Sequence, residues 1–240
     1  MKKLFISFFI LLIVIFAAGV LALAYIGVVP GLSALFVKQV DLGIRPDPVQ
    51  VAKINDDLGH DVELSEDDKP YSGMPEYEGS VDVSGSYSDQ EVTSVLDSWS
   101  KNWALTPFYN VQVKIHADGT AEASGMLKVE TAISLAKELG YSDQQIESAA
   151  KYATFINGDL PVYMMGTASV SSNQVSAGVS NLRIGTVAVP ADITGRVVSA
   201  VEDAVSRRMQ QVSSLDIQHM DLIGGKMNLS GTIPQLERGK

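Results

Sequence analysis

Residues 4–29 form an unbroken run of 26 residues without a charged side chain, and this run constrains the chain more than any other feature. An α-helix rises about 1.5 Å per residue, so about 20 apolar residues span the hydrocarbon core of a bilayer. Lys2 and Lys3 precede the run, and the positive-inside rule keeps such an N-terminus in the cytoplasm. The sequence therefore predicts a single-pass transmembrane anchor over residues 1–30, with everything after Pro30 outside the cytoplasm.

A cleaved signal peptide is the alternative, because Ala22-Leu23-Ala24 has the small-x-small pattern of a cleavage site. The apolar stretch before Ala22 has 18 residues. The apolar region of a signal peptide usually has about 7 to 15. A retained signal-anchor in the cell membrane is therefore the favoured interpretation, and cleavage stays open.

Cysteine is absent, which excludes disulfides, thiolate metal sites, a cysteine nucleophile and a lipoprotein anchor. A disulfide-free extracytoplasmic domain suits a bacterial cell envelope. The net charge of −10 comes from residues 55–90, which hold eleven Asp and Glu against Lys69 alone. Because the rest of the chain is nearly balanced, nucleic acid is not expected as a partner.

Three segments follow from these patterns. After the anchor, residues 31–76 are expected to be a juxtamembrane segment and an acidic linker, with a short helix that begins at Asp47-Pro48. The acidic stretch lacks the residue order of an EF-hand, so a solvated spacer is favoured over a calcium site, and no metal or cofactor is expected. Residues 77–240 are expected to form one extracytoplasmic domain.

The patterns within residues 77–240 predict an α+β domain. Ser88-Asp89-Gln90-Glu91 is a capping box, and the helix that it begins carries an apolar stripe that ends before Pro107. Alternating apolar residues on either side of Asp118-Gly119 predict a β-hairpin. The remaining expected elements are helices at 130–139 and after 142, strands near 160–170, 174–180 and 182–189, a long helix over 191–211, and a hairpin of 215–222 with 226–233.

No catalytic motif identifies a reaction. The three histidines, His60, His116 and His219, lie in separate segments and form no HExxH arrangement. His219 and Asp221 share one strand face, where an exposed pair is the favoured interpretation. The chain also lacks a G-x-S-x-G elbow, a P-loop and a G-x-G-x-x-G loop. An enzyme is therefore disfavoured.

Two amphipathic helices supply the candidate ligand-binding residues. Small side chains in the expected strands, such as Ala121 and Ala177, leave space that a curved sheet can turn into an apolar groove. Ordinary core packing of the same helix faces is the alternative. The residues expected to line the groove are Val95, Leu96, Trp99, Val197, Val201 and Val205.

Three segments carry a family resemblance: residues 88–96 (SDQEVTSVL), 184–190 (IGTVAVP) and 225–234 (GKMNLSGTIP). In this order of elements the chain resembles small bacterial single-pass proteins with a TULIP-like lipid-binding extracytoplasmic domain. The resemblance implies a curved antiparallel sheet around a long amphipathic helix. It also implies an apolar ligand and no catalytic residues.

Two functions follow as hypotheses. The first is a membrane-anchored extracytoplasmic domain that binds an apolar ligand, lipid above all, without catalysis. The second is a structural or scaffold module of the cell envelope that binds a partner protein and has no ligand.

Overall fold

The computed structural model describes residues 38–63, 70–150, 159–212 and 214–239, without the side chains of residues 148–150. The predicted anchor over residues 4–29 lies outside the described residues. Of the helices that are described, none has the length and hydrophobicity needed to cross a bilayer.

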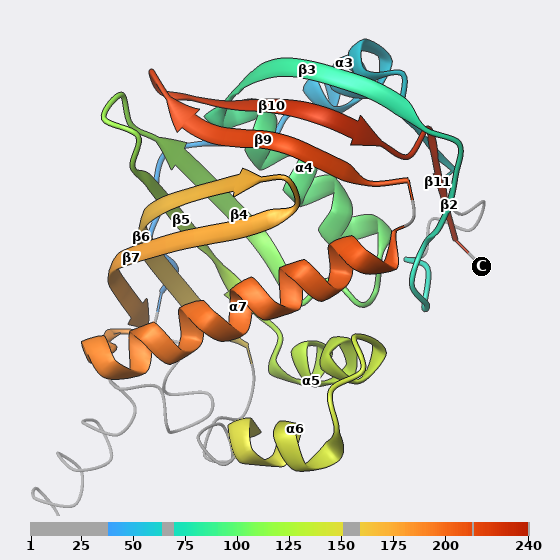
Figure 1. Ribbon diagram of the computed structural model, residues 1–240. Helices are drawn as coiled ribbons and strands as arrows, with labels where there is room; N and C mark the ends of the chain where they lie inside the picture. Colours follow the sequence, from blue (N-terminus) through green and yellow to red (C-terminus); the bar gives the residue numbers. More distant parts are fainter. Residues whose placement is uncertain (1–37, 64–69, 151–158, 213, 240) are drawn as a thin grey trace, which may run out of the picture.

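The fold is α+β, as the sequence predicts, and a curved antiparallel sheet of eight strands forms its centre (Figure 1). Six strands follow one another across this sheet, in the order β3-β10-β9-β6-β5-β4. Strand β7 pairs with β6 outside this path, and the short β8 pairs with β7. The bounds are β3 Val81–Ser88, β4 Phe108–Ile115, β5 Ala121–Leu127, β6 Leu160–Ser171, β7 Gln174–Ile184, β8 Val187–Ala188, β9 Asp216–Ile223 and β10 Lys226–Ile233.

Tight turns connect the paired strands. Gly224 and Gly225 both have positive φ, 64° and 78°, between β9 and β10. Ser172 and Asn173 also have positive φ between β6 and β7. Two-residue turns with positive φ match the twist of the strands that they join. The predicted hairpins of β4 with β5 and of β9 with β10 are thus confirmed, and residues 174–184 form one strand instead of parts of two.

Helix α4 (Asp89–Asn102) begins at the predicted capping box, in which Ser88 and Glu91 each accept a hydrogen bond from the other's backbone N–H. It packs against β4 through Thr93, which is fully buried and whose Oγ1 accepts a hydrogen bond from Val113 N at 2.9 Å. The helix ends at Asn102, earlier than Pro107. Helices α5 (Val129–Glu138) and α6 (Asp143–Ala150) lie at the bottom of the view in Figure 1.

Residues 38–63 pack on the domain and are therefore not a free linker, although residues 31–76 were expected to be a juxtamembrane segment and an acidic linker. The Val40 carbonyl accepts a hydrogen bond from Ser124 on β5. Helix α3 (Pro48–Leu58) starts at the expected Asp47 cap and buries Ile54. Strand β1 (Asp61–Glu63) pairs in parallel with β11 (Leu236–Arg238), which also pairs with β2 (Glu76–Glu78). This three-stranded sheet joins β1 and β2, which precede the main sheet in the chain, to the C-terminal strand β11.

Helix α7 (Ala191–Gln211) has the predicted bounds and packs against β7. Its packed row includes Thr194, which is buried, and Glu202, whose carboxylate accepts a hydrogen bond from Ala177 N at 2.8 Å. Near its C-terminal end, Met209 joins Val170 and Ile217 in a buried hydrophobic cluster. This cluster connects α7 to strands β6 and β9.

Candidate functional site

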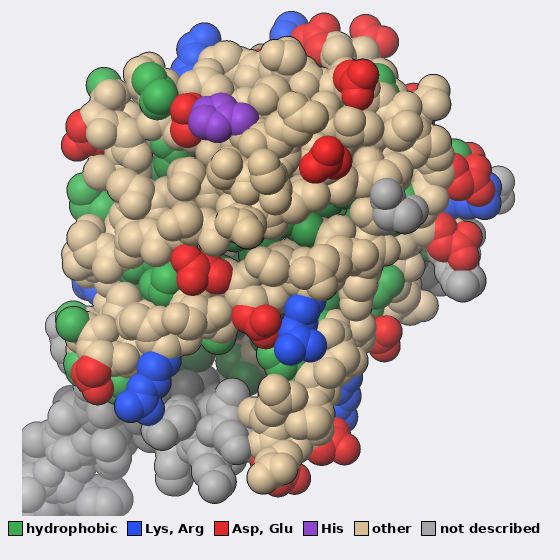
Figure 2. Space-filling view, in the orientation of Figure 1, with side chains coloured by type: hydrophobic (Ala, Val, Ile, Leu, Met, Phe, Trp, Pro, Cys, Tyr) green, Lys and Arg blue, Asp and Glu red, His purple; other side chains and the backbone are tan. Residues whose placement is uncertain are grey.

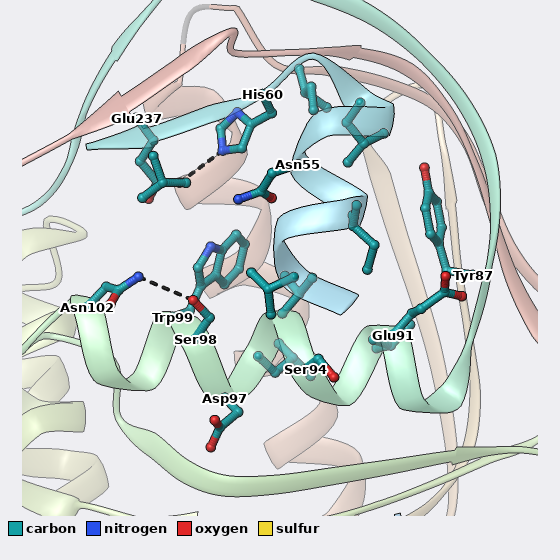
Figure 3. Close-up of a pocket in the computed structure, with 18 of the residues that line it drawn as sticks. Asn55, His60, Tyr87, Glu91, Ser94, Asp97, Ser98, Trp99, Asn102 and Glu237 are labelled. Carbon is teal, nitrogen blue, oxygen red and sulfur yellow. Dashed lines mark hydrogen bonds and ion pairs between the residues drawn. The ribbon is translucent and has the colours of Figure 1, made fainter. Parts of the chain in front are cut away.

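A cavity of about 720 Å³ lies between helices α3 and α4 and the strands β3, β9 and β10 (Figure 3). Its size falls within the range of about 300–1,000 Å³ that is typical of small-molecule sites. Its walls are mainly hydrophobic. The apolar lining residues are Pro46, Pro48, Val51, Ala52, Ile54, Leu58, Val62, Val92, Val95, Leu96, Trp99, Val212, Leu215, Ile217, Met227, Leu229, Ile233 and Pro234.

The Trp99 side chain shows how open this space is. In Figure 3 its indole points from α4 into the space beneath α3. The residue nevertheless remains 45% exposed, although it lies among hydrophobic neighbours. A large aromatic side chain buries about 150–250 Å² when it is packed. Trp99 therefore retains apolar surface that a ligand could cover.

Half of the predicted lining residues meet at this cavity. Val95, Leu96 and Trp99 of α4 line it. Val197 and Val201 of α7, with Val205, do not line it and are 36%, 48% and 39% exposed. The two apolar helix faces therefore do not face each other across one groove. Helix α7 contributes Arg208 instead, and Val212 directly after the helix also lines the cavity.

The orientation of α7 explains this difference. The helix packs on β7 through the row that contains Thr194, Val198 and Glu202. The valine row starts one residue earlier, and with 3.6 residues per turn it lies about 100° around the helix. Since Glu202 bonds to the β7 backbone, the valines lie to one side of the face that contacts the sheet and remain partly exposed. Periodicity identified the apolar face correctly but not its surroundings.

One end of the cavity is polar, and the sequence patterns did not single it out. His60 follows α3, and its Nδ1 donates a hydrogen bond to the Pro234 carbonyl at 2.8 Å. Its Nε2 lies 3.5 Å from a carboxylate oxygen of Glu237, a residue that is 3% exposed. The guanidinium of Arg208 donates a hydrogen bond to the Tyr77 hydroxyl and lies over the Tyr77 ring, 5.2 Å from its centroid. All four residues line the cavity.

The pKa values at this end follow from burial and from neighbouring charge. Burial by itself lowers the pKa of His60, but the Glu237 carboxylate and the Pro234 carbonyl outweigh it and raise this pKa above its ordinary value. Burial, aided by the charge of Glu237, raises the pKa of Tyr77 to about 12. The Tyr77 hydroxyl therefore stays protonated at neutral pH.

The acidic side chains along α4 are engaged with neighbours. Glu91 accepts hydrogen bonds from the backbone N–H and the hydroxyl of Ser88, both at 2.8 Å, and the bond from the N–H is the main cause that lowers its pKa. Asp97 lies 2.6 Å from the Lys101 ammonium. These carboxylates thus stabilise the helix itself.

An S-x-x-K spacing was expected to be absent, and this expectation is wrong. Ser98 and Lys101 on α4 form this spacing, and so do Ser134 and Lys137 on α5. This spacing occurs in serine enzymes that recognise penicillins. In the structure Lys101 pairs with Asp97, and the Ser98 hydroxyl accepts a hydrogen bond from Asn102 at 3.2 Å. This geometry does not place the lysine as a base for the serine.

The remaining histidines and the surface charges do not form a second site. His219 and Asp221 lie 2.8 Å apart, and His219 is largely exposed, as expected for a pair on a sheet face. Among the described residues no three His, Asp or Glu side chains are arranged to hold a metal ion. Figure 2 shows acidic and basic side chains scattered over one face of the molecule, without a concentrated basic patch.

No protein-family model, curated protein or solved structure shows significant similarity to this chain. The resemblance to TULIP-like proteins therefore stays a prediction.

Proposed function

We propose that this chain is a membrane-anchored, extracytoplasmic domain that binds an apolar ligand of the lipid class without catalysis. The observation that carries the proposal is the hydrophobic cavity of about 720 Å³ between α3, α4 and the sheet. Each Å² of apolar surface removed from water contributes about 25 cal/mol. When a hydrocarbon chain lies beside Val95, Trp99 and Leu229, apolar surface of the ligand and apolar surface of these side chains are both removed from water.

The spacing between the predicted anchor and the described fold supports a lipid as ligand. Seven residues, 31–37, separate Pro30 from Lys38. At a maximum of about 3.3–3.6 Å per residue, this length spans about 25 Å or less. From Gln39 onward the chain is attached to the domain, since Gln39 Nε2 donates a hydrogen bond to the Asn110 carbonyl on β4. A retained anchor would therefore hold the domain that contains the cavity near the membrane surface, where lipids are abundant.

Mass spectrometry of the purified full-length protein, with solvent extraction of bound molecules, tests the proposal. We expect a lipid-class molecule to co-purify with the native chain. Val95→Trp should reduce its amount because the larger side chain occupies the cavity. Val197→Trp is the matched control, since Val197 lies outside the cavity, and it should leave the amount unchanged. A native protein that carries and takes up no lipid would contradict the proposal.

A scaffold module that binds a partner protein is the second candidate, and the exposed valine row of α7 favours it. Ile193, Val197, Val201 and Val205 form this row and are 36–48% exposed. Exposed apolar patches often mark interaction sites. If this function holds, Val201→Lys should abolish association with an envelope protein, whereas Val95→Trp should leave that association intact.

A further inference from the structure

The polar end of the cavity carries hydrogen-bond donors that lack acceptors. Arg208 has five N–H donors and no acceptor atom. Within the described residues its side chain has one hydrogen-bond acceptor, the Tyr77 hydroxyl, and no carboxylate within ion-pair distance. The Tyr77 hydroxyl in turn has no acceptor for its own hydrogen in that part of the chain. Both groups line the cavity.

Among the charged side chains of the polar end of the cavity, Arg208 has no carboxylate partner in the described part of the chain, and Asp47 at the other end caps helix α3. His60 and Glu237 form one ion pair when His60 is protonated. Asp97 pairs with Lys101, and Glu91 is held by Ser88 and lies 4.0 Å from Lys53. Each of these carboxylates has a partner of its own, whereas the Arg208 guanidinium has no carboxylate within ion-pair distance among the described residues. A guanidinium without a paired carboxylate beside apolar walls favours an anion attached to a hydrocarbon chain.

We infer that the ligand is a single-chain amphiphile with an acidic head group, which Arg208 and Tyr77 bind while its hydrocarbon chain lies along α4. This inference rests on the proposed function and specifies the class of ligand. Carboxylate and phosphate share the required chemistry, because each accepts several hydrogen bonds from a guanidinium fork. A neutral alcohol would leave most of the donors of Arg208 unsatisfied, and a cationic head group would meet a like charge.

Photo-crosslinking of the full-length protein, kept soluble in an amphipathic polymer, tests this inference. The probes are three C16 chains with the same diazirine group and a carboxylate, a phosphate or a hydroxyl as head group. The variants are Arg208→Gln and, as matched control, Arg207→Gln. Arg207 directly precedes Arg208 in α7, but it pairs with Asp203, stacks on Tyr141 and lies outside the cavity.

We expect the native protein to incorporate the anionic probes at least tenfold more efficiently than the alcohol, with the crosslinks on cavity residues such as Val95 and Leu229. Arg208→Gln should remove this preference and leave incorporation of the alcohol unchanged, whereas Arg207→Gln should keep the preference. The relative yields of the carboxylate and phosphate probes distinguish the two head groups.

Two results would overturn the inference in different ways. If all three probes label the cavity equally, or if Arg208→Gln keeps the preference, the cavity binds lipid but Arg208 does not select an acidic head group. If no probe labels the cavity residues, the proposed function itself fails, and the inference fails with it. Tyr77→Phe gives an independent check, because it removes one donor and should weaken the preference without eliminating it.

Discussion

Helix α3 should contribute measurably to the stability of the domain, and Ile54→Ala measures this contribution. Ile54 is 4% exposed. The substitution removes three carbon atoms, at about 0.8 kcal/mol for each buried CH₂. Alanine is the better helix former by about 0.5 kcal/mol or less, which offsets little of that loss. Because large-to-small substitutions in cores cost about 2–5 kcal/mol, and Ile54 borders a cavity, we expect about 2–3 kcal/mol.

Val201→Ala is the control, since its side chain is 48% exposed. Two methyl groups, half-buried, are worth about 0.8 kcal/mol, and the gain in helix propensity of about 0.6 kcal/mol nearly cancels this loss. Guanidinium unfolding of the full-length proteins, followed by circular dichroism, gives both values. A cost below about 0.5 kcal/mol for Ile54→Ala would refute the packing of residues 48–58 on the domain.

Three further predictions follow from particular contacts. The pKa of His60 in the folded protein is raised above its ordinary value of 6.5, so His60 should stabilise the fold fully below pH 6.5 and progressively less as pH rises through the folded-state pKa. His60→Gln should remove this pH dependence of the unfolding free energy. A stability advantage of the native protein over His60→Gln that grows with pH would contradict this prediction. Ser88→Ala should cost about 1 kcal/mol by removing the cap of α4, measured as a lower midpoint of thermal unfolding. Gly231 has φ of 149°, and a Cβ there would lie 2.1 Å from the Asp216 carbonyl oxygen, so Gly231→Ala should cost about 2 kcal/mol or more in the same assay.

Local signals in the sequence predicted much of the fold. The capping box at Ser88 and Glu91 placed the start of α4, and Pro190 preceded the helix whose bounds were predicted as 191–211. Turn residues such as Gly224-Gly225 located the hairpins. These features depend on residues within a few positions of one another, so they can be read directly from the chain.

The differences between the predicted and the observed fold come from pairing between residues that are far apart in the sequence. Strand β1 pairs with β11 across more than 170 residues, and no local pattern at Asp61 or Leu236 indicates this contact. For this reason residues 31–76 were interpreted as a juxtamembrane segment and an acidic linker, and the polar end formed by His60 and Glu237 was missed. The apolar periodicity of α7 is real, but periodicity cannot tell a buried face from an exposed one, so Val197, Val201 and Val205 were placed in the wrong surroundings.

Fluorescence quenching of Trp99 tests most directly whether the space between α3 and α4 holds a hydrocarbon chain. The chain has two tryptophans, and Trp103 is 5% exposed, stacks on Tyr71 and does not line the cavity. The full-length Trp103→Phe variant therefore reports on the cavity alone, and Trp99→Phe is its control. A brominated C16 fatty acid should quench Trp99 saturably at one molecule per chain and leave Trp103 nearly unaffected. Equal quenching of both tryptophans, or none of Trp99, would contradict a ligand in this cavity.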